Sequence, residues 1–381
     1  MFDRDLLIAG AGPVGATLAL ALRQAEFAVC LCEARTRGEA PRSERVLALS
    51  HGSRLILERL GVWSRLALSP GGLSSIARVE VSQYPGAAQV IFSAAELGLP
   101  ALGYVLSYRD LVSALDAALL ESGVTLHWRT PLLEARGTAS YAWFELGGEQ
   151  AGAGTARLVA IADGAPDADA WQRDYHQRAI LCEVAVAEAQ TLAIERFTEA
   201  GPIALLPRGQ RHALVWTLPE RAARDVLALD DAAFLARLTA QFGTAPGRFS
   251  DPGPRQAHPL ALRLATRPAQ RRLARLGNAA QTLHPVAGQG YNLGLRDAYE
   301  LAQCLLDDKV RALGSERQLR RYLQGRRSDR WGVSLATHGL IELFASSSPS
   351  LVRLREQGMQ MLAATTPLRR LASHVLMHGL R

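Results

Sequence analysis

The pattern of apolar and polar positions predicts an α/β arrangement at the start of the chain. Leu6 to Ala9 form an unbroken apolar run, which indicates a buried strand, and residues 14–24 form an alanine- and leucine-rich stretch of helical length. Glycines separate the two segments. A second apolar run over residues 27–32 predicts another strand, which ends at Glu33. Strand, turn, helix and strand in this order are typical of α/β folds.

The pattern changes further along the chain. From about residue 171 to residue 263 it becomes a series of short alternating segments, which predict an antiparallel sheet. A short strand over residues 272–276 returns the chain to the first sheet, and beyond Arg320 the apolar spacing is helical. We expect helices over residues 53–60, 110–122, 230–242, 292–306, 331–344 and 351–376, and further strands over residues 124–128, 141–146, 158–162, 180–187, 203–206 and 213–218.

These patterns predict three structural regions. Residues 1–72, 104–165 and 271–325 are expected to form one domain, residues 73–103 and 166–270 a sheet domain inserted into it, and residues 326–381 a helical region. The chain has 381 residues, more than a usual single core, which agrees with two domains. The inserted sheet would supply a wall of a substrate cavity.

Composition narrows the class of protein. The chain is 48% hydrophobic and 21% charged, as packed soluble proteins are, and no apolar run is long enough to span a bilayer. We see no secretory signal peptide and no disulfide framework among the four cysteines, so a cytoplasmic location is expected. The net charge of +7 comes from arginines spread along the chain without a nucleic-acid-binding motif, so no nucleic acid partner is expected. A basic surface would still attract anionic lipid or a phosphorylated reductant.

The glycines after the first strand predict a dinucleotide site. Gly10 permits the tight turn, Gly12 lets the backbone approach a pyrophosphate, and Gly15 lets the helix pack closely on the strand. Pro13 and Val14 begin the helix, whose positive N-terminus would hold the phosphates. The alternative is a glycine turn that binds no ligand.

Five further residues are candidates for the same site. Glu33 lies about twenty residues past the glycines, where an acid accepts hydrogen bonds from a ribose. Arg45 follows a polar turn, and Arg109 stands at a predicted helix start, where a positive charge is unfavourable unless it serves a phosphate or a flavin edge. Asp163 and Gly164 end a buried strand. For each arginine, a solvated surface position is the alternative.

A segment near residue 280 predicts the reactive end of the site. It reads RLGNAAQTLHPVAGQGYNLGLRD, and its Asn278 is placed at a strand end to meet a ribityl hydroxyl. A proline and glycines then let the backbone approach a planar ring, and the following helix would stabilise negative charge on that ring. The candidates here are Asn278, Pro285, Gly288, Gln289, Gly290, Tyr291 and Asn292. FAD is therefore the predicted cofactor, and a plain connecting loop is the alternative.

At these residues the chain resembles a known family. The segments GAGPVGATLALAL, RVLALS, YRDL and GNAAQTLHPVAGQGYNLGLRDA resemble the FAD-dependent aromatic hydroxylases of ubiquinone biosynthesis, and most of all the 2-polyprenyl-6-methoxyphenol hydroxylase branch. The resemblance runs to about residue 300. It implies the para-hydroxybenzoate hydroxylase fold, in which a glutathione-reductase-type, Rossmann-like FAD-binding domain carries an inserted antiparallel β-sheet substrate domain. A C-terminal helical segment would follow here.

The resemblance also implies the chemistry. FAD is the cofactor, NAD(P)H is the transient reductant, and one oxygen atom of O2 passes from a C4a-hydroperoxyflavin to the ring of a polyprenyl phenol substrate. The site residues would then divide into those that hold the ADP half (Gly10, Gly12, Gly15, Glu33), those that touch the cofactor elsewhere (Arg45, Arg109, Asn278) and those that border the isoalloxazine (Pro285 to Asn292). His284 and Pro285 are the candidate catalytic residues, with His284 orienting or deprotonating the phenol. A structural histidine is the alternative.

One segment departs from the family. Its members carry Asp-Gly-x-x-Ser-x-x-Arg after the buried strand, in a segment linked to FAD and the nicotinamide reductant, whereas residues 163–170 here lack both the Ser and the Arg. The electron donor therefore stays open. Two other interpretations also remain, namely a flavin hydroxylase of another aromatic substrate and a non-catalytic FAD-fold subunit of a quinone-biosynthesis complex.

The C-terminal helices raise the question of partners. Their apolar stripes, with arginines between, would pack on the FAD domain, on another quinone-biosynthesis protein or second copy of the chain, or on the inner membrane surface as a peripheral protein. His374 and His378 stand one helical turn apart but lack the Glu of a zinc-binding motif, so no metal site is expected.

Overall fold

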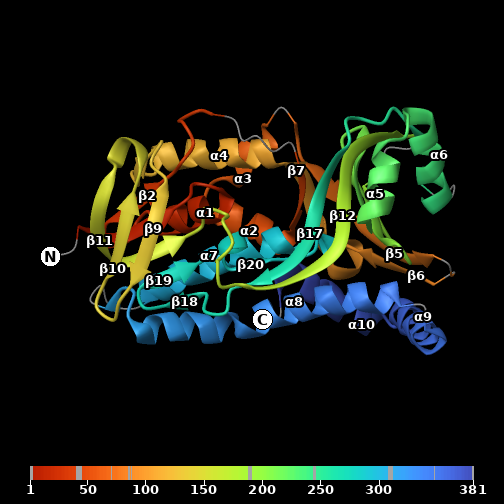
Figure 1. Cartoon of the computed structure of the whole chain (residues 1–381). Helices are drawn as coiled ribbons and strands as arrows, with labels where there is room; N and C mark the ends of the chain where they lie inside the picture. Colours follow the sequence, from red (N-terminus) through yellow and green to blue (C-terminus); the bar gives the residue numbers. More distant parts are fainter. Residues whose placement is uncertain are drawn as a thin grey trace.

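The computed structural model has two large sheets at opposite ends and C-terminal helices that run along one side of both (Figure 1). It describes residues 3–39, 45–69, 71–84, 86, 88–187, 191–242, 246–307, 312–346 and 348–379. The α/β class expected from the sequence is confirmed.

The first sheet explains the apolar run at the start of the chain. Within the described residues its strands follow the order β18-β19-β11-β1-β2-β8, and β9 and β10 extend from β11. Leu6 and Ile8 pack toward helices α1, α4 and α7, whereas Leu7 and Ala9 pack toward β10, so both faces of β1 need apolar side chains. The strands are β1 (Arg4–Ala9), β2 (Val29–Cys32), β8 (Thr125–His127), β9 (Leu132–Gly137), β10 (Ala142–Leu146), β11 (Gly152–Ile161), β18 (Ala269–Gln270) and β19 (Leu273–Arg275), and the helices are α1 (Pro13–Ala21), α4 (Tyr108–Glu121) and α7 (Gln289–Asp307).

The second sheet follows the order β20-β17-β12-β15-β14-β13-β5-β6, with β16 beside β12. Helices α5 and α6 cover one face, where Trp216 packs on Phe234. The sheet was expected to be antiparallel, but β13 and β5 pair in parallel. The reason is that β5 arrives from a separate excursion of the chain, and local alternation does not encode direction. The elements are β5 (Arg78–Tyr84), β6 (Gln89–Ser93), β12 (Trp171–Val186), β13 (Leu192–Thr198), β14 (Gly201–Arg208), β15 (Arg211–Pro219), β16 (Phe249–Ser250), β17 (Gln256–Leu264), β20 (Gln281–Thr282), α5 (Glu220–Leu227) and α6 (Asp231–Phe242).

A small sheet of β3, β7 and β4 joins the two halves. It packs on β14 of the second sheet, and α2 from the same segment packs on α7 and α10. The elements are β3 (Val46–Ser50), β4 (Ser74–Ile76), β7 (Gly103–Ser107), α2 (His51–Arg59) and α3 (Trp63–Ala67), with short 3-10 turns η1 (Ala95–Leu97), η2 (Gly148–Gln150), η3 (Gly277–Ala279) and η4 (Val286–Gly288).

Three helices end the chain, α8 (Glu316–Ala345), α9 (Pro349–Ala364) and α10 (Thr366–His378). The single helix expected over residues 351–376 is wrong, because Pro367 in the first turn of α10 has no N–H with which to continue α9. Helix α8 runs through residue 326, where a separate region was expected to begin. There Arg326 donates hydrogen bonds to Asp297 of α7 at 2.7 Å and to Asp329 of α8 at 2.6 Å, and the buried pair with Asp297 ties α8 to α7.

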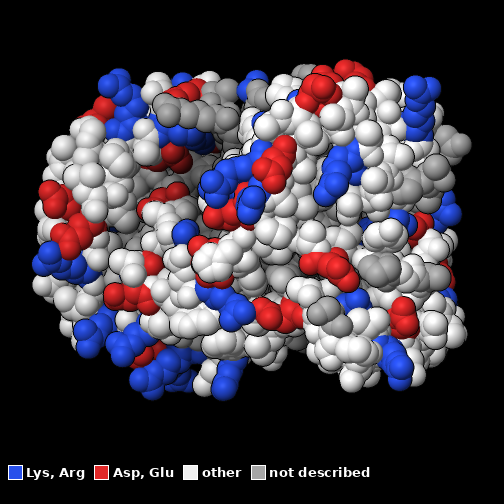
Figure 2. All heavy atoms as spheres, turned by 45° about the vertical axis from the view of Figure 1, so that its right-hand side comes forward, with Lys and Arg blue, Asp and Glu red and all other residues white. Residues whose placement is uncertain are grey.

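Charged side chains of both signs are mixed over the face drawn in Figure 2, so the net charge of +7 forms no continuous basic surface there. Basic side chains gather most densely at its lower left. In the described part of the chain, no helix is both long and apolar enough to cross a bilayer.

Candidate active site

The glycine turn between β1 and α1 has the shape of a ligand cradle. A Cβ atom at Gly10 (φ +96°) would lie 2.6 Å from the Cα atom of Asp163, and one at Gly15 would overlap the carbonyl oxygen of Gly10. A Cβ atom at Gly12 would meet nothing nearer than the Tyr108 hydroxyl at 3.9 Å. The first and third glycines therefore allow close backbone packing, whereas the second leaves open space before the α1 N-terminus, which no side chain caps.

Glu33 directly follows β2 beside this turn and is buried. Its Oε2 atom accepts a hydrogen bond from the Ala11 N–H at 2.6 Å, and its Oε1 atom accepts one from the Arg35 N–H at 2.8 Å. These bonds fix the carboxylate at the carboxyl ends of β1 and β2. Each oxygen keeps a lone pair that a ribose hydroxyl can use.

The two glycine-bearing motifs, more than half the chain apart, meet at Val14. A Cβ atom at Gly277 (φ +57°) or at Gly294 would lie 3.0 Å from the Val14 side chain. Asn278 follows on η3 with its side chain exposed. The tertiary structure thus brings the segment at Gly277 and the start of α1 side by side.

The two candidate arginines lie directly before β3 and in the first turn of α4. Arg45 is exposed, with its guanidinium 4.7 Å from the centre of the Tyr108 ring, and that ring meets Tyr291 edge to face. Arg109 is also exposed. Arg42 to Glu44, the polar turn expected before Arg45, lie outside the described residues.

The segment that departs from the family pattern carries its own ion pair. Asp163 accepts a hydrogen bond from the Ala165 N–H at 3.0 Å, and Gly164 has a positive φ of +83°. Asp167, at the position of the missing Ser, pairs with Arg275 at 3.1 Å. This pair links the segment to the end of β19, and the sequence analysis missed it.

The loop before α7 is shorter than expected. Ala287 (φ +57°) and Gly288 (φ +58°) both adopt left-handed conformations, after which the helix begins at Gln289. The expected helix start at Asn292 is wrong by three residues, so Gln289, Gly290 and Tyr291 form the first helical turn. Two consecutive left-handed residues turn the chain, and nothing in the sequence marks an alanine for that conformation.

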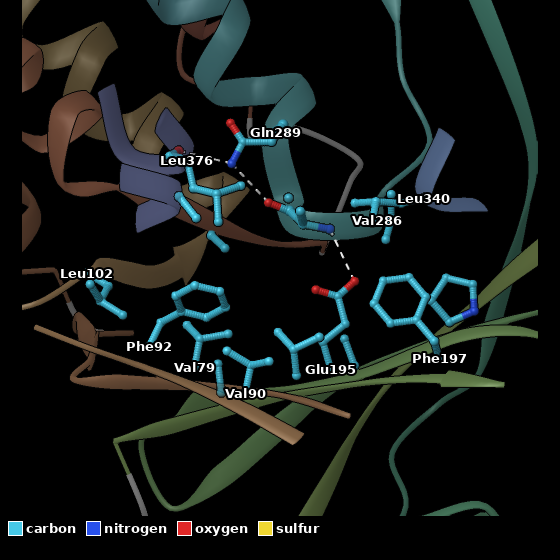
Figure 3. A pocket seen from close by; sticks show the side chains of 18 of the residues that line it. Val79, Val90, Phe92, Leu102, Glu195, Phe197, Val286, Gln289, Leu340 and Leu376 are labelled. Carbon is cyan, nitrogen blue, oxygen red and sulfur yellow. Dashed lines mark hydrogen bonds between the residues drawn. The ribbon is translucent and has the colours of Figure 1, made fainter. Parts of the chain in front are cut away.

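Two amides hold this loop in place. Asn292 accepts hydrogen bonds from the Ser50 N–H at 2.8 Å and the Ser53 hydroxyl at 2.7 Å, and it donates to the carbonyl oxygens of Ala48 and Gly288. Gln289 donates to the carbonyl oxygens of Ala287 at 3.2 Å and Leu376 at 3.1 Å (Figure 3). The side-chain oxygen of Asn292 thus accepts two hydrogen bonds and its nitrogen donates two, all with groups of the protein.

His284 lies behind the loop. It is buried, and its Nδ1 atom accepts a hydrogen bond from the Val286 N–H at 3.2 Å. Burial lowers its pKa to about 4, so the ring is neutral at physiological pH. Pro285 lines the adjacent cavity, but His284 is not among the described lining residues. Its catalytic role stays a prediction.

A cavity of about 790 Å³ lies between the second sheet, the loop and the C-terminal helices (Figure 3). Its wall is almost wholly apolar. The sheet contributes mainly alternate residues of neighbouring strands, including Val79, Val81, Val90, Phe92, Phe197, Ala204 and Val215, and helices α8, α9 and α10 contribute Leu340, Leu343, Phe344, Met359, Leu362 and Leu376. Pockets of this volume hold drug-sized ligands.

Glu195 is the one carboxylic acid among the described residues of this wall. It projects from β13, and its Oε1 atom accepts a hydrogen bond from the Ala287 N–H at 3.2 Å (Figure 3). Burial raises its pKa to about 7. The sequence analysis missed it, because no strand was expected over Leu192–Thr198.

Comparison with known proteins identifies the family of the chain. The FAD binding domain family matches residues 3–334. Ubiquinone hydroxylase UbiL of Rhodospirillum rubrum is 32% identical over 96% of this chain and 88% of its own length, and 3-demethoxyubiquinol 3-hydroxylase of Escherichia coli is 32% identical over 97% of each. Among solved structures, p-nitrophenol 4-monooxygenase PnpA of Pseudomonas putida covers 99% of both chains at 17% identity, with a TM-score of 0.75. The expected FAD-hydroxylase fold is confirmed, and the glycine cradle fits the cofactor FAD.

Proposed function

This chain belongs to the FAD binding domain family and is an FAD-dependent aromatic monooxygenase, and we propose that it hydroxylates a polyprenylated phenol of ubiquinone biosynthesis. The names of the relatives support this pathway. The 2-polyprenyl-6-methoxyphenol branch is the specific reaction we favour. NAD(P)H, the reductant typical of the family, is the proposed electron donor.

The observation that carries the proposal is the apolar cavity beside the loop. It is much larger than one phenol ring requires, and its walls are hydrocarbon side chains from the sheet and from α8 to α10. A prenyl tail would gain free energy from every methylene it buries there, about 0.8 kcal/mol each. A soluble hydroxybenzoate would instead set its carboxylate against an apolar wall, at a desolvation cost.

We propose the cofactor contacts residue by residue. The ADP half would lie at Gly10, Gly12, Pro13, Val14, Gly15 and Glu33, the pyrophosphate and ribityl parts near Arg45, Arg109, Asp163, Gly164 and Asn278, and the ring at Pro285, Gly288, Gln289, Gly290, Tyr291 and Asn292. The open space at Gly12 and the uncapped α1 N-terminus support the first group.

Bound FAD would supply the activation of oxygen. The protein would contribute electrostatic stabilisation, a fixed loop and a cavity without water. The α7 N-terminus favours negative charge at the ring edge. Gln289 and Asn292 hold the loop against α10 and β3, which keeps its backbone in one position. The apolar wall would exclude water and would hold the phenol beside the loop. His284 would orient the loop through the Val286 N–H.

The tail would enter from a membrane surface. Leu354 and Leu376 both line the cavity and are exposed, so the cavity opens between α9 and α10. Met361 and Leu371, on the same helices, are 59% and 61% exposed. Exposed apolar side chains around an apolar opening, with arginines nearby, are typical of peripheral contact with a bilayer.

The test uses purified protein reconstituted with FAD. A phenol that carries one or two isoprene units should stimulate NAD(P)H oxidation and yield a product heavier by one oxygen atom, which mass spectrometry detects. An unprenylated phenol and 4-hydroxybenzoate are the comparisons, and both should give lower kcat/KM. Equal turnover of 4-hydroxybenzoate would favour a soluble-aromatic hydroxylase, and bound FAD without turnover of any phenol would favour a non-catalytic subunit.

A further inference from the structure

The side chains beside Glu195 in the cavity wall are apolar. Its partners in register are Val81 on β5 and Ala204 on β14, and all three line the cavity. The other ionisable side chain on the described wall, Arg355 of α9, directs its Nη1 atom to the carbonyl oxygens of Leu343, Phe344 and Ser346. Placing an acid on such a wall costs desolvation free energy, so its position needs a chemical reason.

The carboxyl group faces the loop on which the ring of FAD is proposed to lie (Figure 3). Its Oε1 atom accepts the hydrogen bond from Ala287, whose left-handed backbone is held on its other side by the Gln289 amide. The Glu195 side chain is enclosed by protein yet partly accessible, and since it lines the cavity, a bound ligand can reach it. The second oxygen is thus available to a phenol held at the loop.

The electrostatic surroundings suit a base. Burial raises the pKa of Glu195 to about 7, and the Ala287 N–H offsets this rise only in part. Among the described residues no charged side chain contributes to the shift, because β5 and β14 present aliphatic groups and the loop carries His284, whose lowered pKa leaves it neutral. Arg355 on α9 is turned to the end of α8. The carboxylate is therefore a stronger base than an ordinary Glu and closer to a phenol, whose pKa is about 10.

We propose that Glu195 is the catalytic base that removes the phenolic proton of the substrate, an inference that rests on the proposed function. The phenol O–H bond breaks, the proton bonds to the free carboxylate oxygen, and the electron pair stays on the phenolate oxygen, where it enriches the ring carbon to be hydroxylated. When the hydroxylated ring becomes aromatic again, the displaced ring proton leaves to solvent and the original oxygen takes its proton back from Glu195.

The variant Glu195→Gln tests this in the FAD-loaded enzyme. It keeps an acceptor oxygen for Ala287 and removes the base. With a short-tail prenyl phenol we expect the hydroxylation rate constant to fall about 100-fold or more, with FAD content and phenol affinity unchanged. The rise of the parent rate between about pH 6 and pH 8 should disappear in the variant. Glu80→Gln is the matched control, because Glu80 on β5 points to the opposite face from Val79 and Val81. It should change neither the hydroxylation rate constant nor its pH dependence.

A prenyl phenol with electron-withdrawing ring substituents separates a base from a structural residue. Such a phenol is already ionised at neutral pH, so Glu195→Gln should hydroxylate it nearly as fast as the parent does. If Glu195→Gln lowered the hydroxylation rate constant equally for both phenols, the assignment would be overturned. It would also be overturned if the variant kept the rate constant and the pH profile of the parent enzyme. The parent alone gives a second test, since its pH dependence should vanish with the acidic phenol. A parent that hydroxylates no prenyl phenol would instead refute the proposed function.

Discussion

Gly12→Val should prevent tight FAD binding while the protein still folds. Outside the neighbouring residues, the atom nearest to the new Cβ atom would be the Tyr108 hydroxyl at 3.9 Å, so the Cβ atom itself would cause no steric conflict. Its side chain would, however, fill the space before the α1 N-terminus. Two hydrogen bonds from backbone N–H groups to phosphate contribute about 1.5–3 kcal/mol each, so their loss costs about 3–6 kcal/mol. That corresponds to an FAD dissociation constant raised by about 10²- to 10⁴-fold.

The assay is titration of FAD into the apoprotein, followed by flavin fluorescence, with far-UV circular dichroism to report folding. Gly339→Ala is the control, because Gly339 lies in α8 with no atom within 4 Å of its Cβ position. That change should leave FAD affinity unaltered and raise the free energy of unfolding by about 1 kcal/mol. A folded Gly12→Val protein that binds FAD as tightly as the parent would refute the assignment of this turn to the pyrophosphate.

Three further outcomes are expected. Arg326→Met leaves Asp297 buried without its cation and leaves Asp329 paired with Arg296 alone, so it should lower the free energy of unfolding by about 3–5 kcal/mol in urea denaturation, whereas a loss below about 1 kcal/mol would contradict the buried pair with Asp297. Because burial lowers the pKa of His284 to about 4, the folded state binds fewer protons than the unfolded chain between about pH 4 and pH 6.5. His284 should therefore contribute a rise of about 3 kcal/mol in the free energy of unfolding over that range, so the difference between the parent and His284→Asn should grow by that amount and level off above about pH 6.5; parallel pH dependences of the two proteins would contradict this. Met359→Trp on α9, beside β6, should raise KM for a long-tail phenol about tenfold and spare a short-tail one, and equal effects on both would argue against a tail site there.

Local constraints explain what could be predicted. Leu6 to Ala9 must be apolar because β1 is covered on both faces, and Gly10 and Gly15 are required where the backbone approaches itself too closely for any side chain. Both signals lie within a few residues and do not depend on the rest of the chain. The first sheet, its glycine turn and the Glu33 that follows could therefore be identified from the sequence.

Other features depend on which distant segments meet. The left-handed backbone of Ala287 is imposed by Glu195 and Gln289 from either side, so the start of α7 could not be derived from residue type. The ion pair of Asp167 with Arg275 and the parallel pairing of β5 likewise require contacts between segments far apart in sequence.

The sequence by itself determined the cofactor turn and the α/β class, since these follow from steric limits and apolar periodicity along short stretches. Only the tertiary structure decided where the substrate would lie. The cavity exists because the C-terminal helices cover one face of the second sheet, and that covering converts an ordinary glutamate on a strand into a buried acid whose pKa is raised to about 7. Desolvation depends on everything packed around a group, so no local pattern encodes it.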